Sequence, residues 1–228
     1  MGGTFGQAEG FHLGAEKDSV IWKLERSGHF TARSLYMWMS FRGMKNKRAE
    51  KIWRSKLPMK LKVFLWLTLQ NRLPTKTKMK QRKWKGEQGC TICGESETLN
   101  HILFSCIVAH FTWTCLKEAF GWDRIPANWG GFTEVWLPLG AREYQYKLLT
   151  FAFVLWGLWN VRNKCSIEGV FPKSPSEPLF KILSYLQRWR LALKEHDREK
   201  LDEQLQQMSS WLRGFACRPR NMALEDFM

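Results

Sequence analysis

The spacing of apolar residues along the chain predicts a mainly helical protein. Over most of the sequence, apolar residues recur three or four positions apart, which places them on one face of a helix. Near the N-terminus, Val20, Trp22 and Leu24 instead occupy every second position, as in a strand, and Ser27-Gly28 can turn the chain back. We therefore expect a mainly α fold with one short N-terminal β-hairpin.

Capping residues and one proline mark where the helices begin. Thr31, Thr75 and Thr98 are suitable N-caps, because their side chains can accept a hydrogen bond from the first turn. Pro58 has the fixed φ of a first helical turn. These signals predict helices over residues 32–41, 58–71, 76–83, 99–120 and 144–163, and one long amphipathic helix over residues 179–211. The segments 43–49, 86–94 and 171–178 are expected to be loops.

Composition divides the chain into five segments. Gly and Pro are frequent where we expect loops, and the apolar spacing is regular where we expect folded parts. We predict a flexible N-terminus, a first folded domain, a connecting loop rich in Gly and Trp, a helical C-terminal region and a flexible tail. In that order they are residues 1–18, 19–120, 121–140, 141–213 and 214–228.

The overall composition is that of an ordinary globular protein, with 44% hydrophobic and 25% charged residues. Its 13 Trp and 15 Phe can form a core without disulfides. The longest nearly apolar run, residues 148–161, is shorter than the ~20 residues of a membrane span, and the N-terminus has no signal-peptide pattern. We expect an intracellular protein that binds no membrane. A basic cluster at residues 45–51 does not decide between nucleus and cytoplasm.

Positive charge is concentrated in residues 42–85, which we call the basic block. The block holds sixteen Lys or Arg against one acid, Glu50, whereas the rest of the chain is balanced. Such a stretch repels itself unless an anion neutralises it, and nucleic-acid phosphate is the commonest anion of that kind. A solvated basic surface without a partner is the alternative.

The end of the basic block combines cations with an aromatic residue and contains no acid. Trp84 lies between Lys83 and Lys85 and is suited to stack on an exposed base, whereas Trp66 lies in an apolar run and is expected in the core. No base-reading pattern is visible, so we expect RNA or single-stranded DNA to bind with weak sequence preference. The predicted contacts are Lys76, Lys78, Lys80, Arg82, Lys83, Trp84 and Lys85.

Four residues in a short stretch have the spacing of a zinc site. Cys90 and Cys93 form a C-x2-C pair followed by Gly94, and His101 and Cys106 complete the pattern C-x2-C-x7-H-x4-C. Three thiolates and one imidazole make a closed tetrahedral set for Zn2+ with no open position for a reacting water, so this zinc would be structural. A redox pair and unliganded buried thiols are the alternatives.

The other ionisable residues near this pattern are expected to have secondary roles. Glu95 or Glu97 would orient His101 from outside the ligand set. His110 is a competitor of Cys106 for the fourth ligand position. The remaining thiols have no partner at ligand spacing and are expected to be buried or incidental: Cys115, Cys165 and Cys217.

The first half of the chain contains an ordered series of motifs. They include Asp18-Ser-Val-Ile-Trp22, Leu57-Pro-Met-Lys-Leu-Lys-Val-Phe-Leu-Trp66, Asn71-Arg-Leu-Pro-Thr75, Cys90-Thr-Ile-Cys93-Gly and Glu97-Thr-Leu-Asn-His101-Ile-Leu-Phe-Ser-Cys106. This series resembles the zinc-binding domain that follows the polymerase in plant non-LTR (LINE-type) retrotransposon reverse transcriptases. The resemblance covers about residues 18–116 and implies that residues 19–120 are such a domain, with the four zinc ligands named above. Downstream, Leu155-Trp-Gly-Leu-Trp-Asn-Val-Arg-Asn163 also resembles a segment of that family. No polymerase, endonuclease or RNase H region accompanies these motifs.

These observations favour a non-catalytic zinc-binding module that binds RNA or DNA through the basic block. The sequence has no Gly-rich phosphate loop, no Gly-x-Ser-x-Gly motif and no HExxH motif, so we expect no catalytic site. One alternative is an interaction or scaffold module that associates through the helix at residues 179–211 and the tryptophans Trp122, Trp129 and Trp136. Another is a decayed fragment without selected function.

Overall fold

The computed structural model of the protein describes residues 19–41, 46–141 and 143–216. The chain divides into two compact units, residues 1–46 and residues 47–228. The predicted flexible N-terminus, the start of the predicted loop at residues 43–49 and most of the predicted tail, including Cys217, lie outside the described residues.

In the first unit, the described residues form one helix, α1 (Ala32–Phe41), over the range that the sequence predicts. Thr31 caps this helix, because its Oγ1 accepts a hydrogen bond from the Ser34 backbone N–H at 3.1 Å. The Ser34 hydroxyl donates in turn to the Thr31 carbonyl at 2.8 Å. The predicted capping role of Thr31 is therefore confirmed.

The predicted β-hairpin before this helix is not supported. Residues 19–31 form consecutive turns without a strand. The Trp22 N–H donates to the Gly28 carbonyl at 2.8 Å, and Gly28 has a φ of 71°. This left-handed residue closes the chain into a loop, in which the Trp22 ring packs against Phe30 at 5.0 Å between centroids. The alternating apolar positions Val20, Trp22 and Leu24 therefore lie in this loop and not in a strand.

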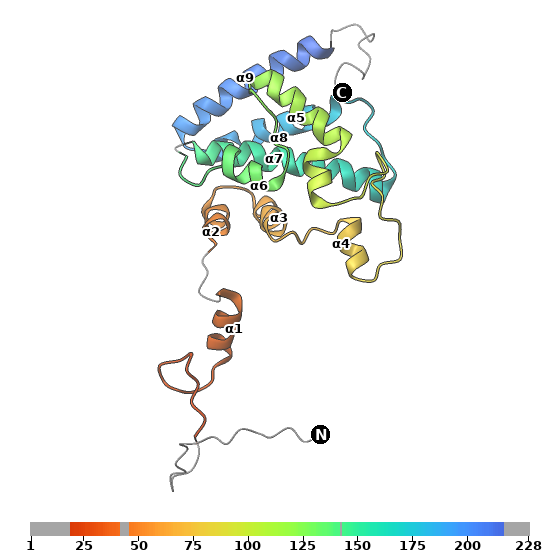
Figure 1. The fold of residues 1–228 in the computed structure, drawn as a ribbon. Coiled ribbons are helices and arrows are strands. Elements are labelled where there is room, and N and C mark those ends of the chain that lie inside the picture. The colour runs from red at the N-terminus through yellow and green to blue at the C-terminus, as the bar shows by residue number, and fades with distance from the viewer. Residues whose placement is uncertain (1–18, 42–45, 142, 217–228) are drawn as a thin grey trace. The chain divides into compact units, whose positions relative to one another are not determined.

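The second unit is a bundle of helices joined by short turns (Figure 1). The helices are α2 (Lys47–Arg54), α3 (Met59–Leu69), α4 (Lys76–Gln81), α5 (Ile107–Phe120), α6 (Trp129–Gly131), α7 (Tyr144–Asn163), α8 (Glu177–Trp189) and α9 (Glu195–Ala216). Three π-helical turns, η1 (His101–Ser105), η2 (Phe132–Trp136) and η3 (Lys164–Glu168), and one 3-10 turn, η4 (Arg190–Ala192), connect them.

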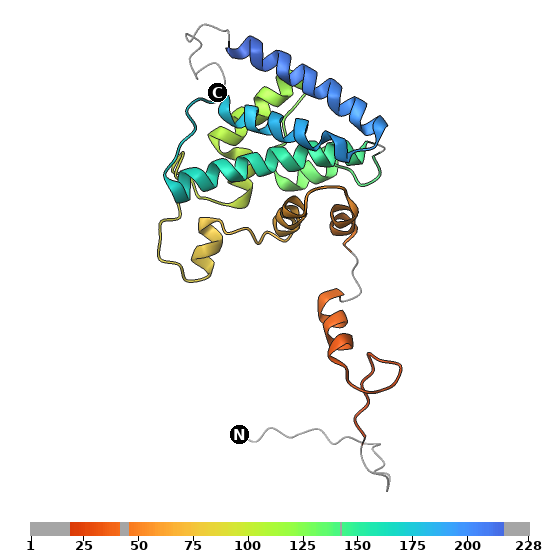
Figure 2. The ribbon, with the colours of Figure 1, turned by 180° about the vertical axis from the view of Figure 1, so that it is seen from behind.

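Helix α7 is the centre of this unit and occupies the range predicted from its apolar run. Residues 148–155 are all buried, because α3 lies on one side of α7 and α8 and α9 lie on the other (Figures 1 and 2). Gly157 permits the close approach of α8, since a Cβ there would lie 2.7 Å from Cγ1 of Ile182. None of the described helices is both long and apolar enough to cross a bilayer.

The single long helix predicted over residues 179–211 is wrong, because the chain forms α8 and α9 with a break between them. Leu193 is extended, with a ψ of 157°. The Arg190 guanidinium holds the two helices together by donating to both carboxylate oxygens of Asp202 at 2.6 Å. The expected apolar positions face the unit's own core, as the buried Leu186 and Leu205 show. The apolar stripe on which the expectation of self-association depends is therefore buried.

The tryptophans of residues 121–140 belong to the core of the unit rather than to an open loop. Trp122 and Trp136 meet at 4.7 Å between ring centroids, and both pack against Phe151 of α7. Trp129 packs against the fully buried Phe132 at 5.7 Å. All three tryptophans are therefore partly buried against the core of the unit.

Candidate metal centre

A tight turn after α4, residues 89–96, presents the first two predicted ligands, and we call it the cysteine knuckle. The Gly94 N–H donates to the Cys90 carbonyl at 2.8 Å, and the Cys90 N–H donates to the Glu95 carbonyl at 2.6 Å. Gly94 has a φ of 80°, which glycine adopts at low cost. A Cβ at Gly89 would lie 2.8 Å from the Gly94 carbonyl oxygen. Both glycines therefore allow the chain to fold back closely enough for Cys90 and Cys93 to face one point.

The other two predicted ligands are the ends of the π-helical turn η1. The Cys106 N–H donates to the His101 carbonyl at 2.7 Å, a hydrogen bond that spans five residues. Thr98 caps the turn as predicted, because its Oγ1 accepts from the His101 N–H at 3.0 Å. The predicted continuous helix over residues 99–120 is wrong at Cys106, where a ψ of 145° separates η1 from α5. This break leaves both side chains facing the cysteine knuckle.

The four predicted ligand atoms lie together in the fold. The Sγ atoms of Cys90, Cys93 and Cys106 and a ring nitrogen of His101 are all within 4.8 Å of one another. Sγ of Cys90 lies 4.0 Å from Sγ of Cys106, and Sγ of Cys93 lies 3.2 Å from Nε2 of His101. In a tetrahedral zinc site the ligand atoms are about 3.5–3.8 Å apart, given Zn–S near 2.3 Å and Zn–N near 2.0 Å. The arrangement and its donors therefore fit one structural Zn2+.

Burial favours the uncharged forms of these side chains, so a cation is needed to hold thiolates here. Cys90, His101 and Cys106 are buried, and Cys93 is partly exposed. Burial raises the pKa of the Cys106 thiol to about 12 and also raises the pKa of Cys93, with the neighbouring Cys90 adding to both. Burial lowers the pKa of His101, which keeps its imidazole neutral and able to coordinate. A bound Zn2+ would compensate for the desolvation of the thiolates.

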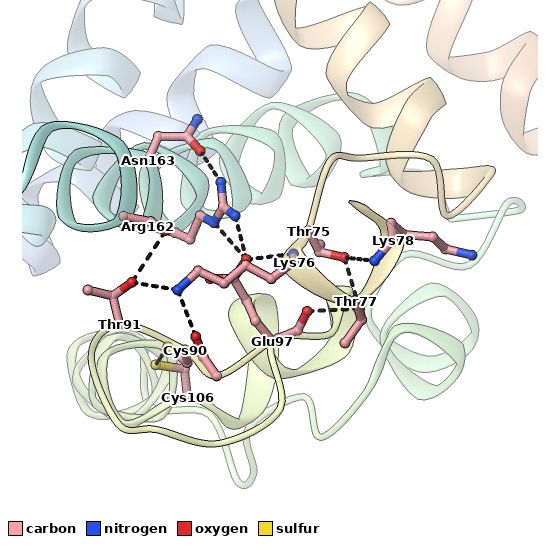
Figure 3. Close-up of polar contacts among 12 residues, drawn as sticks. Thr75, Lys76, Thr77, Lys78, Cys90, Thr91, Glu97, Cys106, Arg162 and Asn163 are labelled. Atoms are coloured by element: carbon pink, nitrogen blue, oxygen red, sulfur yellow. Dashed lines mark hydrogen bonds and ion pairs between the residues drawn. The ribbon is translucent and has the colours of Figure 1, made fainter. Parts of the chain in front are cut away.

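A buried ion pair joins the cysteine knuckle to α7 (Figure 3). Glu97 follows the knuckle and is fully buried, and Arg162 of α7 is 5% exposed. Oε1 of Glu97 accepts from Nε of Arg162 at 3.0 Å and also from its Nη2. The guanidinium lies over the Trp159 ring, 5.1 Å from the centroid, and its Nη1 donates to Oδ1 of Asn163 at 3.0 Å. Removing one partner of such a pair leaves an uncompensated buried charge.

Lys76 ties the same knuckle to α4 (Figure 3). Its Nζ donates to the Gly89 carbonyl at 2.7 Å and to Oγ1 of Thr91 at 2.9 Å. Its backbone N–H donates to Oε1 of Glu97 at 2.9 Å. Thr75 caps the helix as predicted, because its Oγ1 accepts from the Lys78 N–H at 3.3 Å. Side chains from two helices therefore fix the position of the turn that carries Cys90 and Cys93.

The secondary residues predicted around the site have other roles. Among the described residues, no hydrogen bond joins His101 to Glu95 or Glu97, and the buried Glu97 serves Arg162 instead. His110 is exposed on α5 and lies outside the ligand cluster. Cys115 is buried, as expected, and burial raises its pKa to about 12.

One thiol that the sequence leaves without a partner lies near the site. Cys165 of η3 is buried, and its pKa is raised by burial and then by the proximity of Cys90. It is not among the residues whose ligand atoms cluster. No spacing rule could have indicated this proximity, because the two cysteines lie far apart in the sequence.

Lys76 differs from the other predicted nucleic-acid contacts, because its Nζ already donates hydrogen bonds to the knuckle. Lys78 is partly exposed, and its Nζ donates to Oε1 of Gln81 at 3.2 Å. Within the described residues, no carboxylate forms an ion pair with any of the predicted cations. The exposed members of the set lie at the end of α4 and directly after it: Lys80, Arg82, Lys83, Trp84 and Lys85.

Other cations of the basic block are used inside the fold. Nη1 of Arg48 donates to the Thr133 carbonyl at 2.7 Å, and Nζ of Lys51 donates to the Leu139 carbonyl. Both side chains therefore hold α2 against the segment that contains α6 and η2. The uniform block seen in the sequence divides into structural cations and exposed ones.

The region that contains these four residues is similar to known proteins. Residues 30–113 match the family described as zinc-binding in reverse transcriptase. Over 95 residues, the chain is 25% identical to an Arabidopsis thaliana protein named "Putative ribonuclease H protein". That match covers 40% of this chain and 15% of the length of the relative. No solved structure matches the chain.

Proposed function

We propose that this chain is a non-catalytic module of retrotransposon origin that binds RNA or single-stranded DNA, since residues 30–113 match the family described as zinc-binding in reverse transcriptase. In this proposal a structural zinc ion holds the cysteine knuckle, and the exposed cations at and after the end of α4 contact phosphate. The four zinc ligands leave no coordination position for a substrate or a reacting water. The zinc would therefore cross-link the chain rather than take part in a reaction.

The exposed cations beside the knuckle support the proposal most directly. Lys80, Arg82, Lys83 and Lys85 have no acidic partner among the described residues, so their charge faces solvent uncompensated. Each phosphate that such a cation neutralises releases condensed counterions, which favours binding at low salt. These cations lie between Lys76 and the knuckle in the sequence, and Lys76 ties α4 to the knuckle.

The salt dependence of binding tests this function. For a single strand, log K falls with log[salt] by about 0.7 for each neutralised phosphate. Changing Lys80, Arg82, Lys83 and Lys85 to Ala should therefore flatten the slope by up to about 3 and weaken binding to a twelve-nucleotide strand. The measurement is a fluorescence anisotropy titration at several salt concentrations, made with strands of RNA and of DNA.

A matched control removes the same charge elsewhere. Lys173, Arg188, Lys194 and Arg213 are exposed and form no ion pair among the described residues. Changing these four to Ala should leave the slope nearly unchanged. Equal slopes for the two quadruple variants, or no binding at low salt, would contradict the proposed function.

A further inference from the structure

An apolar groove lies beside the exposed cations, between α3, the end of α4 and the C-terminal part of α7. Its volume is about 780 Å3, which is within the range of about 300–1,000 Å3 typical of small-molecule sites. Val63 and Phe64 of α3 form one wall, and Trp156 and Trp159 of α7 form another. Trp84 lies at the edge.

Trp84 differs from the other aromatic residues of the groove because its ring is available. Phe64 packs edge-on against Trp156 at 5.2 Å, and Trp159 is buried against the Arg162 guanidinium. Trp84 is 40% exposed, and no described ring lies within stacking distance of it. Its indole lies directly over Gly86, where a Cβ would come within 2.0 Å of the ring. Gly86 therefore holds the ring position by leaving space beneath it.

The charges around the groove are all positive. Lys60 lines the wall, with its Nζ 5.7 Å from the centroid of the Trp156 ring, and no carboxylate residue lines the groove. Lys83 and Lys85 flank Trp84 in the sequence, and both are exposed. An apolar peptide would satisfy the walls but not these cations. A nucleotide satisfies both, because its base has apolar faces and its backbone carries a phosphate on each side.

We propose that this groove accepts an unpaired base of a bound single strand, with the base stacked on Trp84 and the adjoining phosphates held by Lys60, Lys83 and Lys85. This inference rests on the proposed function, since it assumes that a strand binds, and adds where one base goes. Asn163 and Ser166 also line the groove and offer polar groups to the base edge. Such a site takes any base that stacks and therefore implies weak sequence preference.

A strand without bases separates stacking from phosphate contact. Affinity is measured for a twelve-nucleotide strand of uridines and for an abasic strand of the same length and charge. The intact strand should bind more tightly by about 5- to 150-fold, the effect of stacking one base on an aromatic side chain. Trp84→Ala should remove this ratio and leave the affinity of the abasic strand and its salt slope unchanged.

Two further variants make the result specific to the groove. Trp53 also belongs to the basic block and is 41% exposed, but it does not line the groove, so Trp53→Ala should keep the full ratio. Gly86→Ala keeps every charge and every ring but displaces the Trp84 indole, so it should reduce the ratio as Trp84→Ala does. The same comparison is made with a deoxythymidine strand and its abasic counterpart. A ratio of intact to abasic affinity that is lost in Trp84→Ala supports the proposal with either sugar. The strand that gives this ratio shows whether the site accepts ribose or deoxyribose.

The outcomes distinguish this inference from the proposed function. If intact and abasic strands bind equally, with a salt slope that depends on Lys80 to Lys85, the proposed function stands and the base site is wrong. Tryptophan fluorescence gives a second readout. If a saturating strand changes the emission of the wild-type protein no more than that of Trp84→Ala, the groove serves another class of partner, such as a peptide, and the inference fails. If no strand binds, both proposals fail.

Discussion

At the scale of single residues, the candidate metal centre depends on how burial changes the protonation of its ligands. Cys106 is almost fully buried and Cys93 only partly, yet burial raises the pKa of both thiols. The pKa of His101 is lowered, so its imidazole is already neutral near pH 7. Zinc must therefore displace protons from the thiols but not from the imidazole.

The affinity for zinc should rise steeply with pH. Cys93 and Cys106 are protonated at neutral pH, because their pKa values are raised, and each proton displaced by zinc strengthens binding about tenfold per pH unit. Between pH 6.5 and 7.5 the apparent Kd should fall by at least about a hundredfold. Competition with a chromophoric chelator measures this dependence. In a Cys106→Ser variant the change of the apparent Kd should be about tenfold smaller per pH unit. An unchanged dependence of Kd on pH in that variant would show that Cys106 is not a ligand.

At the scale of elements, the cysteine knuckle is held by contacts that come from two helices. Lys76 reaches it from α4, and Arg162 reaches it from α7 through Glu97. These polar contacts add to the packing of Cys90 and Ile92 against the core in fixing where Cys90 and Cys93 stand relative to η1. Residues that orient metal ligands in this way commonly change metal affinity by 10- to 100-fold when they are removed.

Lys76→Met should weaken zinc binding by about 10- to 100-fold. The substitution keeps the length of the side chain but removes the donor to the Gly89 carbonyl and to Thr91, so the knuckle loses its contact with α4. Lys78→Met is the matched control, because the Nζ of Lys78 bonds only to Gln81 in the same helix. Chelator competition compares the two variants, and equal affinities would contradict a positioning role for Lys76.

At the scale of the whole second unit, the metal site and the central helix form one structure. Arg162 belongs to the last turn of α7, the helix against which α3, α8 and α9 pack. The π-turn is fixed to α5 as well, because Nε1 of the fully buried Trp113 donates to the Leu103 carbonyl at 2.8 Å. Zinc binding should therefore stabilise the bundle as a unit and not the knuckle alone.

Zinc should raise the melting temperature of the protein by about 5–10 °C. Free zinc at a hundred times its Kd adds about 2.7 kcal/mol to the free energy of unfolding, and 1 kcal/mol corresponds to about 2–4 °C for a chain of this size. Far-UV circular dichroism and tryptophan fluorescence should report the same shift, and a chelator should reverse it. His101→Ala should show no zinc-dependent shift. Melting of the wild-type protein that is identical with zinc and with chelator would exclude a structural zinc.

Much of the local structure follows from short-range signals in the sequence. Thr31, Thr75 and Thr98 cap the elements predicted for them, because a cap requires only residues within one turn. The apolar run of α7 predicts a buried helix of the observed length. The four candidate zinc ligands are recognisable because Cys and His at these spacings have few other uses, and the structure brings them together. The predicted hairpin is different, because a strand needs a second strand to pair with and a local pattern does not supply one.

The sequence by itself determined the ligand set, the helix caps and the apolar faces, because each depends on residues close together in the chain. Only the tertiary structure decided that Lys76 holds the knuckle, that Glu97 pairs with Arg162, and that Trp84 borders a groove built from α3 and α7. These contacts join residues of different elements, and no periodicity in the sequence encodes them. They form because each buried charge needs a partner and each apolar face needs another to cover it.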